Sequence, residues 1–354
     1  MPTNAARPVT IADVRRARGR IATHVRRTPV LRAEIDTVSG SVPVVFKLEY
    51  LQLGGSFKAR GSVNAVLAAR DAGKLTDSGV VVASGGNAAI GAAHAARIVG
   101  TRCTVVVPEN APPVKVTALR DLGADVRLHG SRYHDAAEFA GALATKTGAL
   151  LLHAYDLPDI VAGAGTIALE LAADVPGPQT VVACVGGGGL LGGLAAAQRP
   201  GDRLVGAEPT GASSLHQAVK AGGPVSVELD SIAADSLGAT RIGDICWSTI
   251  ADKAVESVVV SDDEIIAARR MLWERFRIVV EHGTATAVAA VAAGLVTPAP
   301  DSTLCVLLRS QHPTRRPLSR LGADRPDKAS DHALHNGRHV PHHVLSAVYP
   351  TQHG

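Results

Sequence analysis

A single lysine stands where a side-chain amine can do chemistry. Residues 53–61 read LGGSFKARG, so Lys58 follows a flexible Gly-Gly-Ser turn and opens an apolar, helix-like run. The positive end of a helix dipole favours the neutral, nucleophilic form of an amine. Such an amine can form a Schiff base with an aldehyde cofactor. On this stretch alone, a purely structural lysine is an open alternative.

The second feature is a glycine loop that follows an apolar strand-like run, VVACVGGGGLLGG at 181–193. Its glycines let consecutive backbone N–H groups point inward, and the helix start adds partial positive charge, so the turn suits a phosphate. Gly187, Gly189 and Gly192 also match the pattern G-x-G-x-x-G. Glu208 follows at the end of the next strand, where a dinucleotide-binding fold carries its ribose-binding acid. A nicotinamide-dependent dehydrogenase therefore stays open, as does a structural role for the glycines.

A third stretch, ASGGNAAIGAA at 83–93, again joins a strand-like run to a helix-like one. Ser84 and Asn87 stand among glycines at the helix start, where backbone N–H groups lack acceptors within the helix. That arrangement suits a carboxylate, and the Asn87 amide can bind a ring hydroxyl or carbonyl. Ordinary helix capping by Ser84 or Asn87 is the structural alternative.

The elements that must position these residues alternate along the chain. Short β-branched runs are followed by Ala/Leu-rich segments, which predicts parallel sheets covered by helices on both faces. We expect an α/β protein of two three-layer αβα domains, with the active site in the cleft between them. The smaller domain is expected at 53–147, and the larger at 1–52 together with 148–308. Thr10 is expected to cap a first helix. The predicted strands are VVFKLE, GVVVAS, CTVVVP, ADVRLH, VVACVG and RLVGAE, and the predicted helices include 86–99, 112–121 and 158–173.

The composition indicates a soluble globular protein, with 46% hydrophobic and 19% charged residues. The net charge of +4 comes largely from basic ends and does not indicate nucleic-acid binding. No signal peptide and no membrane-spanning apolar stretch is visible, so we expect a cytoplasmic protein that binds neither nucleic acid nor a membrane. The four cysteines lack metal-ligand spacing and are expected to be buried free thiols; they are Cys103, Cys184, Cys246 and Cys305.

An amine, a phosphate loop and a carboxylate loop together form the minimal set for pyridoxal-phosphate chemistry. The stretches GGSFKARG, SGGN, AGAGTIALEL, GGGGLLGG and GAEP resemble the motifs of the fold type II (tryptophan synthase β-like) pyridoxal-phosphate family, over about residues 10–308. They are most similar to its serine/threonine dehydratase and serine racemase branch. The resemblance implies dehydration and deamination of L-threonine and/or L-serine to a 2-oxo acid and ammonia, by a homodimer with a small amino-acid substrate.

The same resemblance implies roles for individual residues. Lys58 is the Schiff-base lysine and proton shuttle, and Phe57 lies beside the cofactor. Asn87 binds the 3′-oxygen of the cofactor, and Glu281 lies close to its ring. The residues implied for the 5′-phosphate are Gly186, Gly187, Gly188, Gly189 and Leu190, and those implied for the substrate carboxylate are Ser84, Gly85, Gly86 and Asn87.

Two departures from the family pattern bear on the chemistry. The racemase pattern has a second serine before the Gly-Asn pair, which reprotonates the opposite face of the substrate carbanion. This chain has Gly85 there, so elimination is favoured over racemisation. The metal-binding members carry an acid, a backbone carbonyl and a second acid. Here Glu208 and Ala212 match but Ser214 replaces the second carboxylate, which weakens a Mg²⁺ or Ca²⁺ site.

The third departure lies at the end of the last predicted strand, STLCVLL. The family places a serine or cysteine there, facing the pyridine nitrogen. This chain has Arg309, and Ser310 takes that role if the register slips by one residue. Composition changes at the same point, and seven of the 14 histidines follow. We interpret 309–354 as an atypical tail that is disordered or poorly packed.

Three alternatives stay open beside the dehydratase interpretation. Racemisation or another β-elimination uses the same cofactor, and a catalytically weak amino-acid-binding homologue would keep the fold without the turnover. Sulfhydrylases and threonine synthases of the family usually carry Asp where this chain has Ala59. The dehydrogenase alternative leaves Lys58 and the Asn87 loop unexplained.

Overall fold

The structure, a computed structural model, describes residues 6–310 of the chain and contains two sheets. Neighbouring strands pair in parallel, except for the antiparallel hairpin of β1 and β2. The predicted class, an α/β protein with mainly parallel sheets, is confirmed. In spatial order the larger sheet holds β1 (Val30–Thr37), β2 (Gly40–Lys47), β10 (Thr303–Leu307), β7 (Gln179–Cys184), β8 (Arg203–Pro209) and β9 (Val255–Val260), and the smaller holds β5 (Asp125–Leu128), β4 (Cys103–Val107), β3 (Val80–Ala83) and β6 (Leu150–Leu152).

Helices connect the strands, and the first begins where the sequence predicts. The Thr10 hydroxyl accepts the N–H of Asp13, and the Asp13 carboxylate accepts the N–H of Thr10, which satisfies two donors of the first turn. The helices are α1 (Ile11–Ile21), α2 (Lys58–Asp71), α3 (Asn87–Val99), α4 (Pro113–Asp121), α5 (Tyr133–Thr147), α6 (Pro158–Asp174), α7 (Gly189–Ala196), α8 (Ser214–Ala221), α9 (Ala234–Leu237), α10 (Asp244–Ile250), α11 (Asp262–Phe276) and α12 (His282–Ala292).

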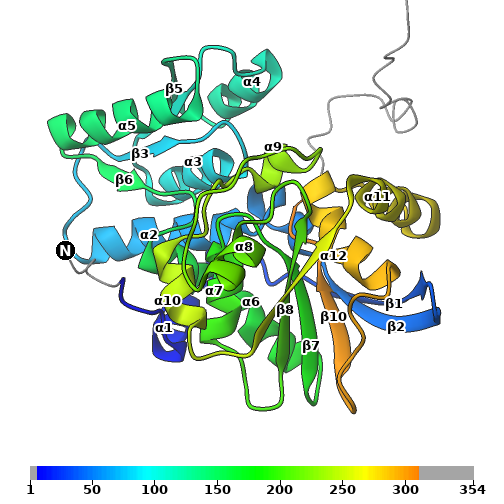
Figure 1. The fold of residues 1–354 in the computed structure, drawn as a ribbon. Coiled ribbons are helices and arrows are strands. Elements are labelled where there is room, and N and C mark those ends of the chain that lie inside the picture. The colour runs from blue at the N-terminus through cyan, green and yellow to red at the C-terminus, as the bar shows by residue number, and fades with distance from the viewer. Residues whose placement is uncertain (1–5, 311–354) are drawn as a thin grey trace, which may run out of the picture. The chain divides into compact units, whose positions relative to one another are not determined.

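Each sheet has helices on both faces, because apolar side chains point alternately to its two sides. In the smaller sheet, Val81 and Ala83 pack with α5, whereas Val80 and Val82 pack with α2 and α3. In the larger sheet, one face packs against α11 and α12 and the other against α6, α7 and α10. Figure 1 shows α5 beside the smaller sheet and α12 beside β10 of the larger one. Both sheets are therefore central layers.

Helix α2, which begins with Lys58, packs against α3 and α6 and so touches helices of both sheets. Its approach to α6 requires glycine on both helices. A Cβ at Gly61 would lie 2.7 Å from the Ile160 carbonyl oxygen, and one at Gly163 would lie 2.6 Å from the Arg60 oxygen.

The division into two domains at the predicted boundaries stays a prediction, since the described residues fall in one compact unit. Strand β6 pairs with β3, so the smaller sheet extends to Leu152, beyond the boundary at 147. Of the predicted tail, only Arg309 and Ser310 are described, and 311–354 lie outside the described residues.

The four cysteines are buried and free, as predicted. Three lie in strands and Cys246 lies in α10. Within residues 6–310, no helix combines the length and apolar character needed to cross a membrane.

Candidate active site

Lys58 is the first residue of α2, as its place after the Gly-Gly-Ser turn suggests. The residue is half-buried, and its Nζ donates to the carbonyl oxygen of Ala154 at 2.6 Å. The same nitrogen lies 5.1 Å from the centre of the Phe57 ring. The amine is therefore held between the start of α2 and the segment that follows β6.

The surroundings of Lys58 favour its neutral form. Burial lowers the pKa of the Lys58 amine from 10.5 to about 7, and the nearby positive charge of Arg309 contributes to this shift. At neutral pH a substantial fraction of the amine is thus uncharged. An uncharged amine can attack an aldehyde, which an ammonium cannot do.

A buried ion network fixes the first turn of α2. Arg60, two residues after Lys58, places Nη2 2.8 Å and Nε 2.8 Å from the two carboxylate oxygens of Glu49. Its Nη1 and Nη2 also lie 2.7 and 2.9 Å from the carboxylate of Glu170. Lys47, fully buried, donates to Glu170 at 2.7 Å. This network joins α2 to β2 and α6 and limits the movement of the Lys58 backbone.

The glycine loop offers five consecutive donors. Among residues 6–310, no backbone or side-chain acceptor is found for the N–H groups of 186–190, which lie at the start of α7. Gly188 has φ 83°, which glycine adopts without strain. A Cβ at Gly187 would collide with the Tyr155 ring, and one at Gly188 would lie 2.6 Å from Cys246 Sγ. This array of donors at a helix N-terminus suits a phosphate.

The turn between β3 and α3 offers a second set of donors. The Ser84 hydroxyl accepts the N–H of Gly86 at 3.2 Å, and Asn87 opens the helix. Within the described part of the chain, the N–H groups of Gly85, Asn87 and Ala88 have no acceptor. The turn can therefore bind a carboxylate, as the sequence predicts, and capping by the Asn87 side chain is not observed.

Glu281 is the residue around which the remaining predicted side chains meet. Asn87 donates its amide to the two oxygens of Glu281 at 2.9 and 3.2 Å, across 194 residues of sequence. The Ser310 hydroxyl also donates to Glu281, and it lies 2.9 Å from the Thr284 hydroxyl. Arg309 Nη2 lies 3.9 Å from a Glu281 oxygen. The end of β10 and the start of α3 are thus joined through one carboxylate.

In the structure Glu208 caps α8, whereas the sequence suggested a metal ligand or a ribose-binding acid. Its carboxylate is fully buried and accepts the N–H of Leu215 at 2.7 Å and that of His216 at 2.8 Å. Ser214 donates to the carbonyl oxygen of Gly186 at 2.8 Å. Among residues 6–310, no group of three or more His, Cys, Asp or Glu side chains is placed to hold a metal. Glu208 therefore caps α8, and these bonds support neither a metal site with Ala212 nor a ribose-binding acid.

Sequence reasoning missed the segment 153–155. It supplies the Ala154 oxygen that accepts from Lys58 and the Tyr155 ring that packs on the glycine loop. Burial lowers the pKa of His153, and the Lys58 charge contributes to that direction while Asp156 opposes it. The available signal was HAYDL, a stretch with His, Tyr and Asp between the apolar run of β6 and the proline that opens α6.

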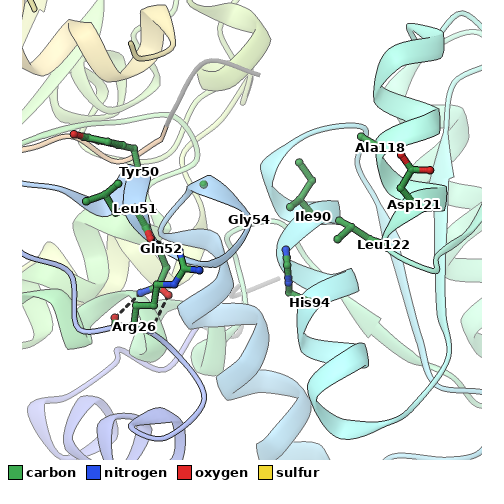
Figure 2. A pocket seen from close by; sticks show the side chains of 11 residues that line it. Arg26, Tyr50, Leu51, Gln52, Gly54, Ile90, His94, Ala118, Asp121 and Leu122 are labelled. Atoms are coloured by element: carbon green, nitrogen blue, oxygen red, sulfur yellow. Dashed lines mark hydrogen bonds between the residues drawn. The ribbon is translucent and has the colours of Figure 1, made fainter. Parts of the chain in front are cut away.

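A separate pocket of about 510 Å³ lies beside the turn that precedes Lys58. Figure 2 shows Gln52 and Gly54 on one side of it, facing Ile90 and His94 of α3. Arg26 donates to the carbonyl oxygen of Leu51 at its rim, 2.8 Å away. Its lining includes none of the residues to which the sequence assigned cofactor chemistry.

The residues brought together fit the cofactor that the sequence implies. Pyridoxal phosphate presents an aldehyde, a ring hydroxyl, a ring nitrogen and a phosphate. The structure offers the Lys58 amine with its lowered pKa, the Asn87 amide, which donates to Glu281, and the unpaired N–H groups of 186–190. Each donor matches a group that the cofactor carries, and the ring nitrogen is the one still without an assigned partner.

Comparison with known proteins agrees with this fit. The profile of the family described as "Pyridoxal-phosphate dependent enzyme" matches residues 21–309. The L-threonine ammonia-lyase of Geobacter sulfurreducens is 36% identical over 297 residues, which cover 83% of this chain and 73% of that protein. The serine racemase of Arabidopsis thaliana is 37% identical over 287 residues, 79% of this chain and 85% of that protein. The solved T.th. threonine deaminase has a TM-score of 0.78 at 33% identity, covering 87% of this chain and 100% of its own.

Proposed function

The chain belongs to the pyridoxal-phosphate-dependent enzyme family, and we propose that it deaminates L-threonine and/or L-serine to a 2-oxo acid and ammonia. The observation that carries this proposal is the Lys58 amine, whose pKa burial lowers to about 7. It shares its site with a phosphate-binding loop and a carboxylate-binding turn. A relative named L-threonine ammonia-lyase supports the choice of substrate.

Different residues of the chain would bind the cofactor and the substrate. The cofactor, when bound, supplies an aldehyde that condenses with amines and a ring that withdraws electrons from the amino-acid Cα. The unpaired N–H groups of 186–190 would bind its phosphate, and the amide of Asn87, which donates to Glu281 in the structure, would bind its ring hydroxyl. The N–H groups of Gly85 and Asn87 bind the substrate carboxylate and orient the Cα–H bond.

Lys58 acts as the proton carrier. Its Nζ would hold the cofactor through the aldehyde and would be free as an amine once a substrate amine occupied that position. The free Nζ would accept the Cα proton, and the burial that lowers its pKa favours this role. Loss of the β-hydroxyl as water, followed by hydrolysis, gives one 2-oxo acid and one ammonia. The Ala154 oxygen, 2.6 Å from Nζ, keeps the amine directed into the site.

Racemisation is the second candidate, since serine racemases are among the relatives. Gly85 carries no side chain that could protonate the opposite face of Cα, which favours elimination. A catalytically weak amino-acid-binding homologue is the remaining alternative. Measurable turnover of L-threonine would exclude it, and binding without turnover would support it.

The test begins with the colour of the purified protein. A protein that holds pyridoxal phosphate on Lys58 is yellow, loses the colour with borohydride, and then carries a reduced adduct on the peptide containing Lys58. Release of 2-oxobutanoate from L-threonine shows turnover. Lys58→Ala is expected to fold but to lose turnover, by about 10²–10⁴-fold, whereas the exposed control Lys74→Ala keeps it.

Two outcomes would contradict the proposal. One is a colourless protein that cannot be reconstituted with the cofactor. The other is a Lys58→Ala variant that deaminates threonine at the wild-type rate. A yellow protein without 2-oxobutanoate release would support the binding homologue instead.

Location, assembly and metal dependence extend the proposal. A cytoplasmic location is supported by four buried free thiols, which persist in reducing compartments. We propose a homodimer, as the family resemblance implies, and sedimentation of the purified protein tests it. A Mg²⁺ or Ca²⁺ ion at Glu208, Ala212 and Ser214 stays a prediction, and the N–H groups bound by Glu208 oppose it.

A further inference from the structure

Arg309 leaves one buried donor unused. The residue is 4% exposed and follows β10, and its Nη2 donates to the carbonyl oxygen of Ser236 at 2.9 Å. Its backbone oxygen accepts the N–H of Phe57, so it lies directly beside the start of α2. Of the buried side-chain nitrogen and oxygen atoms in the described chain, only Arg309 Nε has no hydrogen-bond partner. An unpaired buried donor costs free energy, which indicates a missing acceptor.

The protein groups around Arg309 do not supply that acceptor. Glu281, the nearest carboxylate, lies 3.9 Å from Nη2 and already accepts from Asn87 and Ser310. The Cys184 thiol shares a hydrogen bond with the Arg309 side chain, and burial raises the pKa of that thiol although this bond and the Arg309 charge oppose the shift; Nε itself still has no partner. A neutral thiol is a weak acceptor. An acceptor for Nε is therefore one that a bound molecule can supply.

Ser310, the other candidate for the same role, has its hydroxyl engaged. It donates to Glu281 and lies 2.9 Å from the Thr284 hydroxyl. A hydroxyl has one proton to give. Ser310 therefore has no free donor for a ligand, whereas Arg309 has one.

We propose that Arg309 is the positioning residue for the pyridine nitrogen of the cofactor, to which its Nε–H donates. This inference rests on the proposed function, since it requires bound pyridoxal phosphate. The proposed function assigns the aldehyde to Lys58, the hydroxyl to Asn87 and the phosphate to the N–H groups of 186–190, which leaves the ring nitrogen without an assigned partner. An unprotonated ring nitrogen is a neutral acceptor and suits a donor that stays charged.

The charge of Arg309 then fixes the state of the ring. A guanidinium has donors only, so a protonated ring nitrogen would set N–H against N–H and cation against cation. Lys58 is a second potential cation nearby, and Glu281 is the carboxylate within 4 Å of Arg309. The ring nitrogen is therefore kept without a proton. An unprotonated ring withdraws electrons less strongly, which favours rapid loss of the β-hydroxyl over reprotonation of Cα.

Cofactor binding tests the hydrogen bond without reference to activity. Wild-type protein is titrated with pyridoxal phosphate and with the analogue in which a C–H group replaces the ring nitrogen. We expect the analogue to bind wild type about tenfold or more weakly, because it leaves the charged donor unpaired. In Arg309→Met, which lacks the donor, this preference disappears. In the control Ser310→Ala it persists.

The protonation state is measured separately on the wild-type holoenzyme. With a cofactor labelled with ¹⁵N in the ring, the nitrogen resonance is expected at the position of an unprotonated pyridine. A resonance at the pyridinium position overturns the proposal, even if Arg309→Met cannot be purified. Loss of the preference in Ser310→Ala and its retention in Arg309→Met would also overturn it and assign the role to Ser310.

The two proposals fail differently. If the protein is yellow and forms the Lys58 adduct but shows no preference for the ring nitrogen, the role of Arg309 is wrong and the proposed function stands. If neither the cofactor nor its analogue binds, the proposed function is wrong and the role of Arg309 falls with it.

Discussion

At the scale of the residue, the chemistry of this site depends on what surrounds a side chain. A lysine is a cation in water, and Lys58 becomes an available base because burial and the Arg309 charge lower its pKa to about 7. Arg309 is held in place by its hydrogen bond to the carbonyl oxygen of Ser236 and lies 3.9 Å from a Glu281 oxygen. Removing the Arg309 charge therefore removes one of the two causes that keep the Lys58 pKa low.

Substitution of Gly85 tests whether one residue decides between elimination and racemisation. A Cβ there would meet only Val107 Cγ1, at 3.6 Å, which is an ordinary contact. We expect Gly85→Ser to fold and to gain measurable D-serine formation from L-serine, because its hydroxyl can protonate the face of Cα opposite Lys58. Gly85→Ala is the matched control, with the same Cβ and no proton to give. Chiral chromatography of the amino-acid pool measures both. Equal D-serine formation in the two variants would show that the hydroxyl is not the proton donor.

At the scale of the element, the site is built where parallel strands end. Strands β3, β7 and β10 lead directly into the carboxylate turn, the glycine loop and Arg309. Helix α2 is fixed by the buried pairs of Arg60 with Glu49 and Glu170. Removing one partner from such a pair leaves a buried charge, which costs about 3–5 kcal/mol. Rigid placement of Lys58 thus depends on residues that never touch the substrate.

Glu208, which caps α8, makes stability depend on pH. Burial raises its pKa from 4.5 to about 7, although the N–H groups of Leu215 and His216 oppose the shift. Between these two values the folded state holds more protons than the unfolded chain, so the free energy of unfolding falls as pH rises. This contribution cannot exceed about 1.4 kcal/mol per pH unit. Glu208→Gln cannot ionise and is expected to flatten the pH dependence, whatever its effect at a single pH.

Urea unfolding at several pH values between about 4.5 and 7 measures this slope. The exposed control Glu274→Gln is expected to keep the wild-type slope. A Glu208→Gln slope equal to that of wild type would show that Glu208 does not change its protonation over this range. Added Mg²⁺ is expected to leave the wild-type midpoint unchanged if Glu208 serves only as a cap.

At the scale of the whole molecule, sequence patterns predicted individual helices, strands and loops better than the contacts between residues far apart in the chain. The β-branched runs predicted β2, β3, β4, β5, β7, β8 and β10 but not β1, β6 and β9. The Thr10 signal predicted the start of α1. Both kinds of signal depend on neighbours in the chain. The glycine loop was readable because a run of glycines before a helix has few other uses. The bond between Asn87 and Glu281 spans 194 residues, and the role of the Ala154 oxygen belongs to a backbone atom. Neither leaves a local signal. The antiparallel β1–β2 hairpin was also not predicted.

The last prediction concerns how cofactor binding joins the two sheets. Lys58 and Asn87 begin helices that pack together beside the smaller sheet, whereas the glycine loop and Arg309 follow strands of the larger one. One cofactor bound by both sets should slow amide exchange in β3 and α3 as well as in β7 and α7. At a hundred times its dissociation constant, a ligand stabilises the folded state by about 2.7 kcal/mol. Hydrogen exchange of the loaded and cofactor-free protein measures the change segment by segment. Lys58→Ala, which can hold the cofactor only non-covalently, is expected to show a smaller gain in the same segments. Protection confined to the segments of one sheet would mean that the cofactor is held from one side, and the predicted cleft between two domains would then be wrong.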